Sequence, residues 1–101
     1  MPGEGHTGVN SVMLVEKRED LAGYSCRVMR IEPGGSTAMH GHPREHVMVP
    51  LQGKVRVETG TVAAEAEPGV AVYIPADTPH RFVNPTDRQT VIMVQNLFGK
   101  Q

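Results

Sequence analysis

The chain has 101 residues, which is enough for one hydrophobic core and too few for two. Lysine and arginine total 10 against 11 aspartate and glutamate residues and form no basic cluster, so binding to nucleic acid or an anionic membrane is disfavoured. The single cysteine, Cys26, excludes an intrachain disulfide, and neither a secretory leader nor an apolar run of roughly 18 residues occurs, so we expect a cytoplasmic protein that does not enter a membrane.

Short segments of β character follow one another along the chain. Residues 1–8, rich in glycine and polar groups, are predicted to form a loose N-terminal arm, and residues 9–101 a single domain. Within the domain, alternating or β-branched residues occupy 11–16, 24–31, 46–51, 54–58, 61–66, 70–74, 80–83 and 90–97. Glycine or proline marks turns at 32–35, 52–53, 67–69, 75–79 and 84–87. This pattern predicts an all-β sandwich or barrel.

Four of the five histidines lie in two places, His40, His42 and His46 in one segment and His80 in another. Side chains at i and i+2 of an extended strand point to the same face about 6.6 Å apart, so His40 and His42 converge. Pro43 then interrupts the strand, which lets His46 return to the same place from a neighbouring strand. Converging neutral imidazoles suit a divalent transition metal better than calcium or magnesium. The spacing alone also fits a solvated surface or a packed histidine pair.

Two longer motifs surround these histidines. From Gly34 the sequence reads GGSTAMHGHPREHVMVPLQG, and from Gly69 it reads GVAVYIPADTPHRFVN. The first resembles the first motif of the cupin superfamily, in which a His-x-His pair is followed by a further ligand and a closing glycine. The second resembles the second cupin motif, which ends in histidine and asparagine. The two motifs occur in the family's order, and with the flanking strands the resemblance covers residues 24–97. The chain is therefore similar to small single-domain cupins.

The resemblance implies an antiparallel double-stranded β-helix, the jelly-roll cupin barrel. The family's metal ligands carry over onto His40, His42, His46 and His80. Most cupins have glutamate where His46 stands, so this sequence resembles the four-histidine subgroup. Asp77 takes the place of a motif glycine, and aspartate tolerates left-handed backbone angles. One divalent transition metal is implied, with manganese favoured and iron, nickel, copper, cobalt and zinc as alternatives.

The expected ligand set indicates the chemistry of the site. Four imidazoles on an octahedral metal leave two positions, which a substrate and dioxygen, or one chelating substrate, would occupy. Neutral ligands leave the positive charge on the metal, which favours an anionic oxygen donor such as an enolate, a diketonate or a carboxylate. We therefore expect a metal-dependent, dioxygenase-like enzyme, or a related one, acting on a small oxygen-chelating molecule inside the barrel. The alternatives are a binding or sensing cupin, a metal-dependent isomerase or cyclase, and a metal-stabilised structural subunit.

Three side chains near the motifs are expected to lie close to a bound substrate. Phe82, two residues beyond His80, is expected to line a substrate pocket together with Met48 and Met93. Methionine is expected to pack rather than bind metal, because thioethers mainly suit Cu(I).

Other residues are expected to lie outside the chemistry. Cys26 is interpreted as a packed thiol, Glu45 and Arg81 as solvated side chains, and His6 receives no role. Small barrels expose sheet edges, and similar cupins pair through N-terminal strands, so a homodimer through residues 11–16 is expected.

Overall fold

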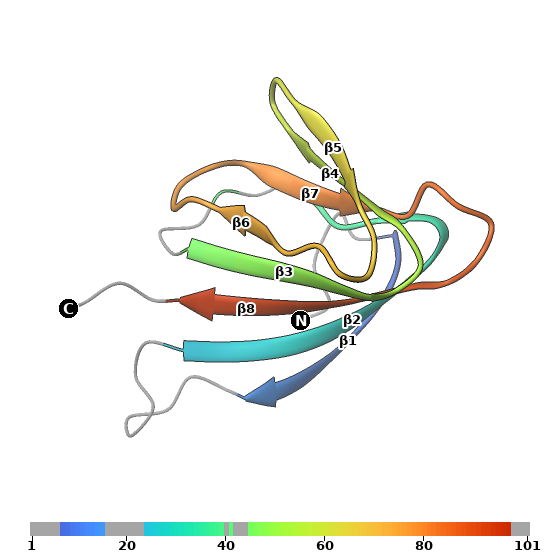
Figure 1. Ribbon diagram of the computed structural model, residues 1–101, viewed down its shortest axis with the longest axis horizontal. Helices are drawn as coiled ribbons and strands as arrows, with labels where there is room; N and C mark the ends of the chain where they lie inside the picture. The colour runs from blue at the N-terminus through green and yellow to red at the C-terminus, as the bar shows by residue number, and fades with distance from the viewer. Residues whose placement is uncertain (1–6, 16–23, 40, 42–44, 98–101) are drawn as a thin grey trace.

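The computed structural model describes residues 7–15, 24–39, 41 and 45–97, and this part of the chain is built from β-strands (Figure 1). Among the described residues, every pair of neighbouring strands is antiparallel. The described residues include no helix long and apolar enough to cross a membrane. The all-β prediction is confirmed. The strands are β1 (Thr7–Val15), β2 (Tyr24–Ser36), β3 (Glu45–Gln52), β4 (Val55–Thr59), β5 (Ala63–Ala66), β6 (Val72–Ile74), β7 (His80–Val83) and β8 (Thr90–Leu97).

The strands form two layers that face each other across a shared interior (Figure 1). Hydrogen bonds connect them in the order β5-β4-β7-β2-β8-β3-β6, and β1 pairs with β2. One layer contains β1, β2, β8, β3 and β6, and the other contains β5, β4 and β7. Strand β2 belongs to both layers, because it pairs with β8 over most of its length and with β7 at its end. The sheet therefore wraps into a nearly closed barrel.

Strand β2 runs from one layer into the other through residues 32–35, where a turn was predicted. The Glu-Pro-Gly-Gly sequence after the second predicted strand does not end the strand, which continues to Ser36. Gly34 has a φ of 76°, a conformation that glycine adopts without steric cost, and so bends the strand. The backbone then pairs with Asn84, whose oxygen accepts from Gly34 N at 3.1 Å and whose nitrogen donates to Gly35 O at 3.0 Å. The turn residues thus make a corner within a strand.

The first strand begins earlier than predicted. Thr7 and Gly8 belong to β1, and Thr7 pairs with Ser36 of β2, although residues 1–8 were expected to be a loose arm. A register shift between Thr7 and Val9 coincides with the positive φ of Gly8, 63°. Residues 1–6, which include His6, lie outside the described residues.

Alternation of buried and more exposed residues along strands such as β3, β7 and β8 separates the interior of the barrel from its outer surface. In β8 every second residue, beginning with Thr90, is buried. The buried apolar side chains form one contiguous cluster. Full burial of a large aliphatic or aromatic side chain stabilises the folded state by roughly 1.5–3 kcal/mol. The members of the cluster are Met29, Ile31, Met48, Val55, Val57, Ala66, Ile74, Phe82, Ile92 and Val94.

Candidate functional site

Two of the predicted metal ligands meet inside one end of the barrel. His46 lies at the start of β3 and His80 at the start of β7, on opposite layers. Their ring centroids are 5.0 Å apart with an interplanar angle of 62°, and the residues are 4% and 6% exposed. We call this end, where β2, β3 and β7 begin, the histidine end. The fold therefore brings the two cupin-like motifs together.

The other two predicted ligands, His40 and His42, lie outside the described residues. Within the part of the chain that the structure describes, no three histidine, cysteine, aspartate or glutamate side chains form a cluster suited to a metal. The four-histidine set therefore stays a prediction, and the geometry below concerns His46 and His80.

A buried hydrogen-bond chain fixes the orientation of His46. Its Nδ1 lies 2.6 Å from Asn96 Oδ1, and Asn96 Nδ2 donates to Ser25 Oγ at 3.0 Å. The amide oxygen can only accept, so Nδ1 of His46 carries the proton. In the neutral ring the lone pair is then on Nε2, which is buried inside the barrel. Three strands thus cooperate to set one tautomer: β3, β8 and β2.

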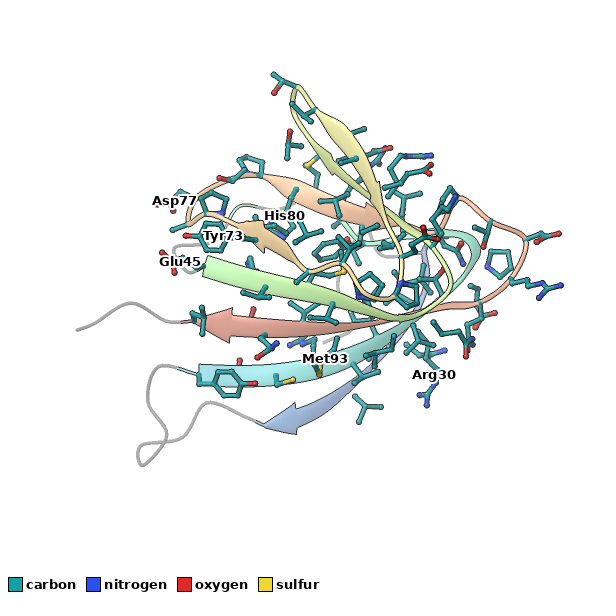
Figure 2. The ribbon with its side chains drawn as sticks, viewed as in Figure 1. Arg30, Glu45, Tyr73, Asp77, His80 and Met93 are labelled. Carbon is teal, nitrogen blue, oxygen red and sulfur yellow. The ribbon has the colours of Figure 1, made fainter. Side chains whose placement is uncertain are left out.

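The backbone sets the same tautomer in His80. Its Nδ1 lies 2.8 Å from the carbonyl oxygen of Thr78, which can only accept. The preceding loop reaches this geometry through Asp77, whose φ of 63° confirms that aspartate adopts the left-handed conformation expected there. Figure 2 shows Asp77 and His80 at the same end of the barrel. The neutral His80 ring therefore also has its lone pair on Nε2.

These two rings have the chemical character of metal ligands. Histidines that bind a metal usually donate their second ring N–H to a carbonyl, a carboxylate or a water, which fixes the tautomer and raises the basicity of the ligating nitrogen. His46 donates to an amide carbonyl and His80 to a backbone carbonyl. Two converging imidazole donors fit a divalent transition metal such as manganese, iron, cobalt, nickel, copper or zinc.

The exposed rim of the histidine end carries a tyrosine and a carboxylate. Glu45 begins β3 and is exposed, and Tyr73 on the adjacent β6 is 55% exposed. A hydrogen bond with Glu45, followed by desolvation, raises the pKa of Tyr73 above 10.0. Figure 2 shows both side chains near the end of the barrel that holds His80. At neutral pH the Tyr73 phenol therefore stays protonated, and it lies beside the Glu45 side chain on the rim.

The three predicted pocket residues do not share one position. Phe82 lies 5.3 Å from His80 between ring centroids and is 3% exposed, and Met48 is fully buried, so both belong to the apolar core beneath the histidines. Met93 lies between the buried residues Ile92 and Val94 on β8 and points to the opposite, outer face. Met93 therefore does not line the interior.

Three neighbours of the motifs lie as expected. Arg81 points outward, where its Nε contacts Glu58 Oε1 at 2.6 Å, and Glu58 also accepts from Arg56 at 2.7 Å. Cys26 is a buried free thiol. Glu45, adjacent to His46, is exposed.

The sequence reasoning missed the polar residues that support the site from inside. Ser25, Arg27 and Asn96 occupy the same alternating positions as the buried apolar residues of their strands. Once the structure shows that Ile31 and Ile92 face inward, counting in steps of two places these side chains in the interior as well. A polar residue in such a position is a signal for a functional or supporting role, because its burial is otherwise costly.

Comparison with known proteins gives one family and many similar folds. The family described as "Cupin domain" matches residues 27–95. No curated protein matches the chain.

Solved structures share the fold at low sequence identity. The polyketide cyclase RemF from Streptomyces resistomycificus is 24% identical, with a TM-score of 0.81 over 94% of this chain and 68% of that one. A Cupin 2 conserved barrel domain protein from Salinispora arenicola CNS-205 is 22% identical, with a TM-score of 0.78 over 88% and 75%. The Cupin_2 domain of an XRE family transcriptional regulator from Enterobacter cloacae is 16% identical, with a TM-score of 0.80 over 93% and 100%. The expected jelly-roll barrel is confirmed.

Proposed function

Because this chain belongs to the cupin domain family, we propose that it binds one divalent transition metal and acts as a metal-dependent oxygenase, or a related enzyme, on a small oxygen-chelating molecule. The proposed ligands are His46 and His80, together with His40 and His42 of the first motif. Manganese is the favoured metal, with iron, nickel, copper, cobalt and zinc as alternatives.

One observation carries the proposal: two buried imidazoles, 5.0 Å apart between ring centroids, both have Nδ1 engaged with a carbonyl oxygen. A histidine pair that served packing alone would have no need of a common tautomer. With both Nδ1 atoms engaged, each ring keeps its Nε2 lone pair for a shared metal. The supporting residues Asn96 and Ser25 extend this arrangement into a buried polar chain.

The residues of the chain divide the work of such a site. His46 and His80 hold the metal, and Asn96 and Thr78 orient their rings. When bound, the metal supplies a Lewis acid that polarises the oxygen atoms of a ligand and, if redox-active, a route for electrons to dioxygen. Phe82, packed against His80, closes the site from below and excludes water from that side.

The charge balance of the proposed site favours an anionic ligand. Imidazole donors are neutral, so the metal's positive charge is not compensated by its protein ligands. An enolate, a diketonate or a carboxylate with a second oxygen would complete the coordination and balance the charge. Proteins with a similar fold include a polyketide cyclase and a domain of a transcriptional regulator, so cyclase, isomerase or sensing roles are the alternatives.

The proposal is tested by elemental analysis of the untagged protein, followed by oxygen consumption with a panel of small diketones, flavonols and hydroxy acids. We expect near-stoichiometric manganese or another transition metal, and substrate-dependent oxygen uptake. Metal without uptake would leave the metal site and favour a cyclase, an isomerase or a binding module. Protein that purifies without metal and takes up none from manganese, iron, nickel or zinc salts would refute the proposal.

A matched pair of variants separates the site from general damage. His80→Ala should lose most of the bound metal, whereas Arg81→Ala, which removes the adjacent outward side chain, should retain it. Equal metal content in the two variants would argue against His80 as a ligand.

A further inference from the structure

A cationic side chain is placed in the interior of the barrel near the histidine end. Arg27 lies in β2 between Ser25 and Met29 and shares their inward-facing positions, because side chains alternate along the strand without a register shift against β8. Its partner on β8 is Val94, which is 5% exposed. The stem of Arg27 is therefore half-buried among apolar side chains of the core.

One hydrogen-bond donor of this side chain finds no acceptor within the described part of the chain. Arg27 Nε is buried and has no hydrogen-bond partner among the described residues, and none of the ion pairs found there involves it. A buried donor without an acceptor destabilises the fold. The next inward-facing position of β2 is Met29 and the partner of Arg27 on β8 is Val94, so apolar side chains fit this part of the interior. An arginine held at this cost calls for an acceptor beyond the described residues, and a bound anionic ligand would supply one.

The position of Arg27 relates it to the proposed metal site. Ser25, Asn96 and His46 form one row across β2, β8 and β3, and Arg27 lies one inward-facing step deeper than Ser25. Strand spacing and rise put the Cα atoms of Arg27 and His46 on the order of 12 Å apart. The sheet curves around the interior, so the two inward side chains converge to a separation that a small molecule spans.

We propose that Arg27 is a specificity-determining residue that binds the carboxylate of the barrel's ligand. This inference rests on the proposed function, in which the other end of the same molecule offers an oxygen donor to the histidine site. The ligand class is then a small hydroxy- or oxo-carboxylic acid. A guanidinium suits this role because its planar fork donates two parallel hydrogen bonds to a carboxylate, which the point charge of lysine does not match.

The test uses the metal-loaded protein and calorimetric titration with three acids, pyruvate, 2-oxobutyrate and salicylate, each compared with its neutral amide. Wild-type protein should prefer at least one acid over its amide. Arg27→Met should weaken binding of that acid about ten- to a hundredfold, the range expected for loss of hydrogen bonds to a charged group, and leave amide binding unchanged. Arg27→Lys should fall between the two.

The matched control is Arg30→Met, because Arg30 lies on the same strand, is exposed and points away from the barrel in Figure 2. It should leave acid binding unchanged. Thermal denaturation provides a second readout: Arg27→Met should melt at a higher temperature than wild type, since it removes a buried donor without an acceptor. Equal acid affinity in wild type and Arg27→Met, or no preference of the wild type for any acid over its amide, would overturn the proposal.

Elemental analysis of the same samples separates this inference from the proposed function. Arg27-dependent acid binding by protein that holds no metal would keep the role of Arg27 and refute the metal-dependent function. Full metal content with no preference for acids would refute the role of Arg27 and leave the proposed metal-dependent function standing.

Discussion

Asn96→Ala tests whether the buried hydrogen-bond chain holds His46 in its ligating tautomer. In the wild type, Asn96 accepts from His46 Nδ1 at 2.6 Å and donates to Ser25 Oγ at 3.0 Å. Alanine leaves a buried N–H and a buried hydroxyl without these partners, and each such loss costs about 1–3 kcal/mol. We therefore expect unfolding free energy to fall by roughly 2–5 kcal/mol, measured by urea denaturation of the metal-free protein.

The same substitution should weaken metal binding, because the His46 ring becomes able to change tautomer or rotate. Loss of a partner that orients a ligating histidine lowers metal affinity about 10- to 100-fold, which competition with a chromophoric chelator measures. Asn96→Asp is the matched control, since a carboxylate still accepts from His46 and from the Ser25 hydroxyl, and it should bind metal within a few-fold of wild type. Unchanged metal affinity and stability in Asn96→Ala would refute the reasoning.

Two further predictions concern the frame around the site. Hydrogen bonds from Arg56 and Arg81 lower the pKa of Glu58 below 4.5, so the stabilising contribution of Glu58 is present above pH 4.5 and disappears as the pH falls through the lowered pKa. Glu58→Gln should therefore be less stable than wild type at pH 7 in urea denaturation, and the difference should vanish in strong acid. A difference in stability that does not change with pH would contradict this prediction. Gly35→Ala would place a Cβ 2.5 Å from a backbone oxygen of β1 and should lower the free energy of unfolding by about 1–3 kcal/mol. Gly60→Ala is the control, because no atom lies within 4 Å of the added Cβ, and it should not lower stability. Equal denaturation midpoints for the two variants would show that the corner of β2 moves to accommodate the methyl group.

Sequence motifs predict the central pair of the site well, because the order of turns and strands forces it. His46 and His80 each lie at the start of a strand, and antiparallel wrapping brings the starts of β3 and β7 to the same end. His46 and His80 are accordingly close, with ring centroids 5.0 Å apart. The homodimer, the cytoplasmic location, the binding of a metal and the identity of that metal stay predictions.

The position of Met93 could not be predicted because its strand is apolar in both phases. In residues 90–97 the sequence TVIMVQNL places an apolar residue on each face, so hydrophobicity alone does not identify the inward one. Tertiary pairing decides: Thr90 and Asn96 face inward because each finds a buried hydrogen-bond partner, Lys54 O for Thr90 and His46 for Asn96. Met93 is consequently on the outer face.

The bend of β2 was misread for a related reason. Glycine and proline at 32–35 have the composition of a chain reversal, and the local sequence cannot distinguish a reversal from a corner inside one long strand. The distinction comes from Asn84, far along the chain, whose side chain donates to Ile31 O at 2.8 Å and whose backbone pairs across the corner.

The hydrogen-bond chain through His46, Asn96 and Ser25 also determines when in folding the site can exist. Asn96 is 50 residues from His46 and 71 residues from Ser25 along the sequence. Contacts this distant require closure of large loops before they contribute any stabilisation, so they form late and slowly. During synthesis, His46 leaves the ribosome well before the residue that sets its tautomer, and a metal ion captured earlier would meet histidines without fixed orientation. If the proposed metal site is correct, acquisition of the metal should follow the docking of β8 between β2 and β3, which would make that docking the kinetic checkpoint for maturation.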